Sequence, residues 1–406
     1  MRVALVFRNF NMGGSLERDA MLHARALADA GVEVHAYCNP DTSVAELGGV
    51  TFHDVRPATV SRSRLGYPLE CASFAAAATR ALRRDRSRYD IVDVHGTATW
   101  EHDVVTVHAV TKAEQRRWPF EAGKDYRAAR LRAYVGALTR PQLGVARSIE
   151  RLQFRSGRFE RVIAVAESVR NDVVRIHGVD AAQIDVIPNP IDLDPFTNAR
   201  RKGTRRHLGL EAEDAALLFV GHDFERKGLG DAIAALPLVR HPRAHLLVVG
   251  AGDSERFRRE AARAGVADRV HFFGRTEAPE DFYGEADLFL FPTRHDPGGN
   301  PLVEAMAAGV PIVATRIAGV ASQVEAAGAG VFVPDRAPRE LAEAVSALLE
   351  DPARARAMGA RGPAAARPFG LRPYTTTLVA AYEGVLRARP VGGRAPRSFA
   401  RGKARG

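Results

Sequence analysis

Short apolar runs rich in valine, isoleucine, leucine and phenylalanine alternate with helical stretches through most of the sequence. Such runs are typical of strands that are buried on both faces of a parallel sheet. The pattern therefore predicts an α/β protein. The chain has 406 residues, and one hydrophobic core usually serves no more than ~250–300 residues. We therefore expect two domains.

The apolar runs place the strands in two groups. The first group comprises Arg2–Phe7, Val32–Tyr37, Ile91–Val94, Val104–Val107, Val162–Val165 and Asp185–Ile187. The second comprises Ala216–Val220, His245–Val249, Val270–Phe272, Leu288–Phe291 and Pro311–Ala314.

Two prolines, Pro188 and Pro190, separate the two groups of strands. Because proline is excluded from helix interiors and central strands, we place the domain boundary there, with domains at 1–188 and 189–372. Residues 373–388 have the apolar spacing of an amphipathic helix, which we expect to pack back on the first domain. Residues 389–406 are rich in glycine, proline and arginine, and we expect a disordered basic tail.

The formal net charge of +10 is unevenly distributed. Seven cations and no acid follow Glu383, and twelve cations stand against four acids in residues 116–161. A regional positive field predicts an anionic partner, such as nucleic acid, a phospholipid surface or a phosphorylated substrate; a solvated arginine-rich surface is the alternative. Aromatic residues such as Trp118 and Tyr126 lie among the cations of 116–161, which favours an anionic membrane surface.

The sequence indicates a cytoplasmic protein. The first apolar run ends before Arg8 and is too short for a secretory signal, and no stretch reaches the ~18 uncharged apolar residues of a membrane span. The two cysteines do not form a disulfide framework. Any membrane association is therefore expected to be peripheral.

A glycine pair, Gly13 and Gly14, lies between the first strand and a predicted helix that contains Asp19. Glycines allow backbone amides to approach a phosphate closely, and the helix adds its positive end. We interpret the loop as a phosphate contact, although glycine pairs also occur in ordinary turns.

Two adjacent cations, Arg226 and Lys227, follow the first strand of the second domain. Ligands bind at the carboxyl ends of strands in open α/β sheets, and these two charges suit a diphosphate. A solvated charged loop is the alternative interpretation.

Two acids, Asp296 and Glu304, flank a glycine-rich loop and the start of a helix. The loop amides point toward an anion, and one acid can reach a sugar. Glu304 lies in an apolar stretch, where an unpaired carboxylate would be costly, so it requires a hydroxyl partner. No metal site is expected, because His95, His102 and His108 lack cysteine neighbours and the spacing of a zinc motif.

Taken in order, these motifs resemble the retaining nucleotide-sugar glycosyltransferases of family 4, with the closest resemblance to bacterial lipopolysaccharide-core glucosyltransferases. The resemblance covers nearly all of residues 1–388. The paired-acid signature of the family, Glu-x7-Glu, is matched by Asp296 and Glu304, with Asp in place of the first Glu. The resemblance implies the GT-B fold, in which two Rossmann-like domains face each other across a donor cleft.

The resemblance also implies a role for each matching residue. Glu304 would bind the nucleotide ribose, Asp296 the donor sugar, and Arg226 with Lys227 the diphosphate. His108 would lie beside the donor sugar, although a core histidine is an equal alternative. The remaining donor-binding residues implied are Gly13, Gly14, Asp19, Gly274, Arg275, Gly299, Asn300, Pro301 and Leu302.

The implied reaction is metal-independent transfer of a hexose, with retention, to a cell-envelope glycan or lipid-linked acceptor. The co-substrate would be a nucleotide-diphosphate sugar, with a UDP-sugar favoured, and no cofactor is implied. Two alternatives remain: a nucleotide-sugar 2-epimerase on the same fold, and a basic nucleic-acid-binding protein. The low aromatic content of 7% and the absence of an RNA-binding motif argue against the second alternative.

Overall fold

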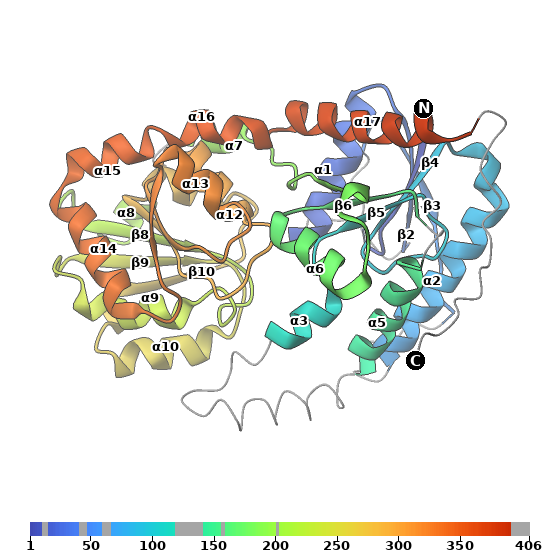
Figure 1. Ribbon diagram of the computed structural model, residues 1–406. Helices are drawn as coiled ribbons and strands as arrows, with labels where there is room; N and C mark the ends of the chain where they lie inside the picture. The colour runs from blue at the N-terminus through green and yellow to red at the C-terminus, as the bar shows by residue number, and fades with distance from the viewer. Residues whose placement is uncertain are drawn as a thin grey trace. The chain divides into compact units, whose positions relative to one another are not determined.

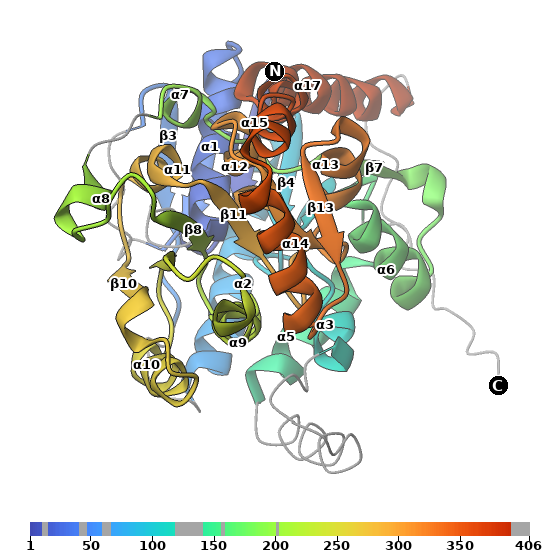
Figure 2. The same ribbon diagram turned by 90° about the vertical axis from the view of Figure 1, so that its left-hand side faces the viewer.

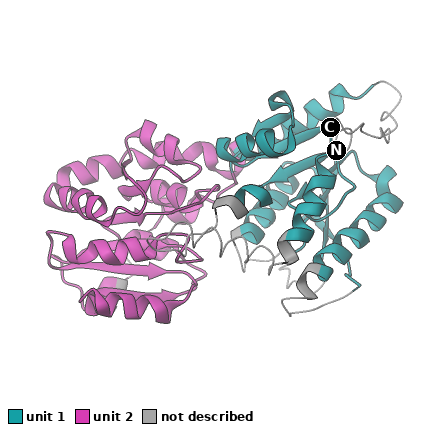
Figure 3. Ribbon diagram, turned by 60° about the horizontal axis from the view of Figure 1, so that its bottom comes forward, with its two compact units in different colours: residues 1–119, 125–188, 374–406 teal, residues 120–124, 189–373 magenta. Residues whose placement is uncertain are grey.

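The computed structural model describes residues 1–9, 15–39, 47–58, 66–117, 141–155, 159–199 and 203–390. The chain forms two compact units (Figure 3). Among the described residues, the second unit is Asn189–Pro373. The first unit contains the residues before it together with those from Tyr374 onward. In the described part of the chain, no helix is long and apolar enough to cross a membrane.

The first unit contains a parallel sheet with the strand order β3-β2-β1-β4-β5-β6-β7 (Figure 1). Every adjacent pair is parallel, as expected for strands joined by helical crossovers. The strands are β1 (Arg2–Val6), β2 (Glu33–Cys38), β3 (Val50–Asp54), β4 (Ile91–His95), β5 (Val104–Val107), β6 (Arg161–Ala164) and β7 (Ile184–Val186). The longer helices are α1 (Ser15–Asp29), α2 (Gly66–Asp85), α3 (Thr111–Arg117), α5 (Pro141–Gln153), α6 (Glu167–His177) and α17 (Leu371–Ala388).

Alternate residues of the central strand β4 face opposite sides of this sheet. Val92 and Val94 join the apolar core that also contains Phe74 and Leu82 of α2. Asp93 and His95 occupy the alternate positions, where Asp93 meets Tyr382 of α17. One face of β4 is therefore apolar, whereas the other carries buried polar groups.

The second unit contains a parallel sheet with the order β10-β9-β8-β11-β12-β13 (Figure 2). Its strands are β8 (Ala215–Val220), β9 (Ala244–Val249), β10 (Val270–Gly274), β11 (Leu288–Phe291), β12 (Ile312–Thr315) and β13 (Gly330–Val333). Its helices are α7 (Asp194–Thr197), α8 (Thr204–His207), α9 (Leu229–Ala235), α10 (Ser254–Arg263), α11 (Glu280–Glu285), α12 (Asn300–Ala307), α13 (Ala321–Ala327), α14 (Pro338–Glu350), α15 (Pro352–Gly359) and α16 (Gly362–Ala366).

Both faces of the second sheet are covered. Leu217 and Phe219 of β8 join a core with residues of α9, α10 and α14. Ala216 and Leu218, which alternate with them, join a second core with residues of α11, α12, α13 and α16. Burial on both faces explains why these strands are continuous apolar runs, and the predicted α/β class is confirmed.

The structure differs from the sequence prediction at the sheet edges. The edge strands β3 and β13 were not predicted. Most predicted strand ends move by one residue, β10 extends two residues further to Gly274, and α17 begins at Leu371 rather than Pro373. Proline is tolerated in the first helical turn, because the N–H groups there have no partner within the helix. Buried Tyr374, Leu378, Tyr382 and Val385 define the inner face of α17, whereas Ala381 is only partly buried.

Candidate functional site

Two loops meet at the carboxyl ends of the adjacent strands β8 and β11. The Arg294 amide donates to the carbonyl of Arg226 at 2.9 Å, and the Arg226 guanidinium donates to the carbonyl of His295 at 2.8 Å. These bonds hold the loop after β8 against the loop after β11. Arg226 and Lys227, predicted from the loop after β8, therefore lie beside Asp296, predicted from the loop after β11.

Lys227 and Asp296 form a buried ion pair. The Lys227 Nζ donates to Asp296 Oδ2 at 2.6 Å and lies 4.9 Å from the centre of the Phe291 ring. Burial would raise the pKa of Asp296, but Lys227 and Arg226 outweigh it and hold that pKa below its usual value. Burial is the main cause that holds the pKa of Lys227 below its usual value, and Asp296 opposes it. A cation and an anion are thus fixed beside each other where donor-binding groups were predicted.

A second layer of charges supports this pair. Arg294 forms ion pairs with Glu225 and Asp231, and Glu225 also accepts from Arg256 at 2.6 Å. Glu225 directly precedes Arg226 in sequence, and Asp231 follows Lys227 in α9. They therefore fix the backbone that carries the two cations.

Glycine 228 permits the close approach of the two loops. Its φ is +79°, and an added Cβ would lie 1.9 Å from the carbonyl oxygen of Pro292. Any side chain at this position would push the loop that carries Lys227 away from the loop that carries Asp296.

We expect Gly228→Ala to destabilise the protein by about 2–5 kcal/mol, the sum of left-handed backbone strain and overpacking. Gly209→Ala is the matched control, because Gly209 has a φ of +67° and an added Cβ there would meet nothing within 4 Å. Urea unfolding of both variants measures the difference. Equal destabilisation would show that contact with Pro292 is unimportant.

The helix α12 begins at Asn300, directly after Gly299, whose φ is +67°. Of the predicted amides, that of Leu302 donates to the carbonyl of Gly299 at 2.9 Å and that of Gly299 donates to Asp296, whereas Asn300 is the first residue of the helix and Pro301 has no amide hydrogen. Asn300 accepts a hydrogen bond from Asn189 at 3.3 Å. This contact anchors the start of α12 to the beginning of the second unit.

Glu304 lies in the second turn of α12 and is buried. Its Oε2 accepts a hydrogen bond from the hydroxyl of Tyr283 in α11 at 2.9 Å. The protein thus supplies a hydroxyl partner for Glu304, as its apolar neighbourhood in the sequence predicted. Tyr283 was missed, because it lies 21 residues away in a short polar helix with no recognisable motif.

The other candidates in the second unit lie further along the sheet. Gly274 ends the edge strand β10 with a φ of +72°, and its carbonyl accepts from the amide of Gly250 at 2.7 Å. Arg275 is exposed. Both residues lie at the same carboxyl edge of the sheet as Lys227, separated from β8 by β9.

The candidates in the first unit lie near the ends of β4 and β5. His108 directly follows β5, and its Nε2 is 3.2 Å from Nδ1 of His95. Asp19 is buried in α1 and raises the pKa of Tyr374 together with burial and Asp93. Gly13 and Gly14 lie outside the described residues, as does most of the basic segment 116–161 and of the tail.

Comparison with known proteins assigns each half of the chain to a glycosyltransferase family. Residues 13–195 match the family described as Glycosyltransferase Family 4, and residues 201–365 match Glycosyl transferases group 1. The two matches divide the chain close to the junction of the compact units.

Curated relatives are named as glycosyltransferases. A protein of Segniliparus rotundus named D-inositol 3-phosphate glycosyltransferase is 31% identical over 60% of this chain and 56% of its own length. A protein of Thermobispora bispora with the same name is 26% identical over 91% of this chain and 90% of its own length. The chain thus spans little more than half the length of the first relatives it matches.

Solved structures share the fold. The lipopolysaccharide-biosynthesis glycosyltransferase WaaG has a TM-score of 0.75 at 23% identity, covering 94% of this chain and all of WaaG. Anabaena Alr3699/HepE in complex with UDP-glucose has a TM-score of 0.72 at 18% identity, covering 95% and 100%. These matches confirm the GT-B fold class, and the two family models show that a region matching Glycosyltransferase Family 4 is followed by one matching Glycosyl transferases group 1.

Proposed function

We propose that this glycosyltransferase moves a hexose from a UDP-sugar to its acceptor with retention of configuration and without a divalent metal in the transfer step. The observation that carries the proposal is the buried Lys227–Asp296 pair beside Arg226 and the first turn of α12. Cations and helix amides would stabilise the charge that develops on a diphosphate, and a carboxylate would orient sugar hydroxyls.

In this proposal the sugar departs as an oxocarbenium-like species, and the leaving phosphate takes the proton of the acceptor on the same face. The protein supplies position and charge stabilisation. Glu304 would hold the ribose, and Gly274 with Arg275 would lie beside the base. His108 and the Gly13–Gly14 loop would contact the donor from the first unit.

The donor assignment is tested by thermal shift with UDP-, GDP- and ADP-sugars. We expect the largest shift with a UDP-sugar, because a ligand at a hundred times its Kd stabilises the folded state by about 2.7 kcal/mol. Absence of a shift with every nucleotide sugar would refute the donor site. Incubation with a UDP-sugar alone distinguishes the alternative, since a 2-epimerase would convert the sugar without an acceptor.

For the acceptor we propose a cell-envelope glycan or lipid-linked molecule, reached from the cytoplasmic face of an anionic membrane. The cations and aromatic residues of segment 116–161 support this choice. The names of the relatives favour a second candidate, D-inositol 3-phosphate. Radiolabelled transfer to D-inositol 3-phosphate in solution, compared with transfer to lipid-linked glycan in anionic vesicles, decides between them.

Transfer is expected to be independent of added metal. Because Arg226 and Lys227 would neutralise the leaving group, protein assayed in EDTA should gain less than about twofold in rate when excess Mg²⁺ or Mn²⁺ is added. Steady-state rates before and after metal addition check this prediction. A strict requirement for either ion would overturn the mechanism.

A further inference from the structure

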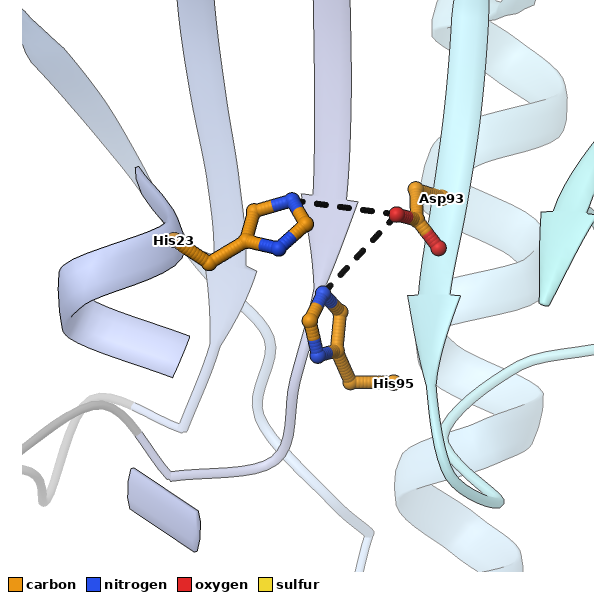
Figure 4. A group of neighbouring side chains, drawn as sticks. All are labelled: His23, Asp93 and His95. Atoms are coloured by element: carbon orange, nitrogen blue, oxygen red, sulfur yellow. Dashed lines mark ion pairs between the residues drawn. The ribbon is translucent and has the colours of Figure 1, made fainter. Parts of the chain in front are cut away.

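A buried polar cluster lies on one face of the sheet in the first unit, next to His108. His23 comes from α1, Asp93 and His95 come from β4, and Tyr374 and Tyr382 come from α17 (Figure 4 shows the first three). The exposed fractions of His23, Asp93 and His95 are 1%, 0% and 4%. Solvent therefore does not satisfy these groups.

Four of these side chains converge on a common point. The ligand atoms of His23, Asp93 and His95 all lie within 4.8 Å of one another. Asp93 Oδ2 is 3.8 Å from His23 Nε2 and 3.9 Å from His95 Nε2. The Tyr382 hydroxyl is 2.6 Å from Asp93 Oδ2 and 3.2 Å from His23 Nε2. Ligands of a tetrahedral zinc ion are about 3.4 Å apart, which is within this range of separations.

The atoms of these side chains that face away from the common point form hydrogen-bonding contacts with other residues, as metal ligands usually do. His23 Nδ1 lies 2.6 Å from the Tyr374 hydroxyl, and His95 Nδ1 lies 3.2 Å from His108 Nε2. Asp93 accepts from the Thr106 hydroxyl at 2.9 Å. Such outer contacts orient a histidine so that its other nitrogen faces the ion.

The charge of the cluster is incomplete without a cation. Within the described residues, no lysine or arginine forms an ion pair with Asp93. The cluster therefore places a buried carboxyl group beside two buried imidazoles without a lysine or arginine partner, and a bound cation would supply the missing charge.

A purely hydrogen-bonded network explains only part of this arrangement. The Tyr382 hydroxyl contacts both Asp93 and Nε2 of His23. The Tyr374 hydroxyl contacts Nδ1, the other ring nitrogen of His23. His95 Nε2, however, is buried with no hydrogen-bond partner in the described part of the chain, although it faces Asp93. A donor atom left unsatisfied in this position indicates a missing ligand.

We propose that His23, Asp93 and His95 bind one Zn²⁺ ion. Two imidazoles and one carboxylate suit zinc, and the Tyr382 hydroxyl would orient Asp93 by its 2.6 Å hydrogen bond. The ion would join α1 to β4, and α17 would be held to it through Tyr382 and Asp93. The role is structural, although the proposed ligand His95 contacts His108, which is proposed to touch the donor. The Mg²⁺ and Mn²⁺ prediction is unchanged.

The test measures zinc in untagged full-length protein by mass spectrometry, with no substrate present. We expect about one zinc per chain in the wild type and at least a tenfold loss in His23→Ala and His95→Ala. His245→Ala is the control, because His245 forms a histidine pair with His271 at 3.1 Å in the other unit. It should retain the wild-type zinc content.

A second measurement does not depend on the folding of variants. Wild-type protein stripped with a strong zinc chelator should melt at a lower temperature and recover when Zn²⁺ is restored. Co²⁺ added to the stripped protein should give the absorption of a tetrahedral site. Wild-type protein with less than a tenth of an equivalent of zinc, no Co²⁺ spectrum and an unchanged melting temperature would overturn the proposal in favour of a metal-free network.

Discussion

Replacing Lys227 with alanine should lower kcat/KM for sugar transfer by about 10²–10³-fold, and replacing Arg226 as well should remove most of the affinity for the nucleotide diphosphate. Loss of one preorganised donor has an effect of that size, and each charged hydrogen bond contributes on the order of 1.5–3 kcal/mol. Calorimetric titration with UDP and initial-rate kinetics measure the two effects. The alanine at 227 also leaves Asp296 buried without its cation, at a cost of about 3–5 kcal/mol in stability.

The stability loss must be separated from the loss of binding. The double variant Lys227→Ala with Asp296→Asn removes the unpaired charge, so it should regain stability without regaining activity. Arg316→Ala is a control in the same unit, because Arg316 pairs with Glu325 at the surface, 2.7 Å away. Wild-type UDP affinity in the folded Arg226–Lys227 double variant would refute the diphosphate assignment.

Glutamine and leucine at position 304 should have different effects. Glu304→Gln keeps an oxygen that accepts from Tyr283, so the variant should fold with little loss of stability. Glu304→Leu removes that acceptor from a buried hydroxyl and should cost about 1–3 kcal/mol. Both lose the carboxylate proposed to bind ribose, and we expect UDP affinity to fall about tenfold or more, corresponding to about 1.4 kcal/mol. Urea unfolding and titration with UDP measure the two properties.

A second buried glutamate provides the control for this experiment. Glu285 Oε1 accepts from the amide of Gly203 at 2.6 Å, a contact within the same unit that is not part of the proposed donor site. Glu285→Gln should therefore leave UDP affinity unchanged. If Glu304→Gln also binds UDP as the wild type does, the ribose assignment is wrong and Glu304 is a structural partner of Tyr283.

The sequence alone determined the fold class and the central strands of both sheets. Strands such as β5 and β11 are buried on both faces, so their residues are almost all apolar and the pattern is unambiguous. The edge strands β3 and β13 are only partly buried, and polar residues such as Thr51 and His53 interrupt the apolar pattern of β3. Local spacing likewise predicted Asp296 and Glu304 as site residues, because a glycine-rich loop that follows a strand can be recognised from neighbouring residues alone.

Only the tertiary structure decided which of these groups are partners. Lys227 and Asp296 are 69 residues apart, and Tyr382 and Asp93 are 289 apart. Such pairs depend on which strands are adjacent and on which face each helix covers, and neither property is encoded in local spacing. The same packing brings His23 to Asp93 and His95, whose sequence neighbourhood predicted no metal site. Periodicity therefore specified the elements, whereas the long-range contacts of buried charged groups were set by the packing of those elements.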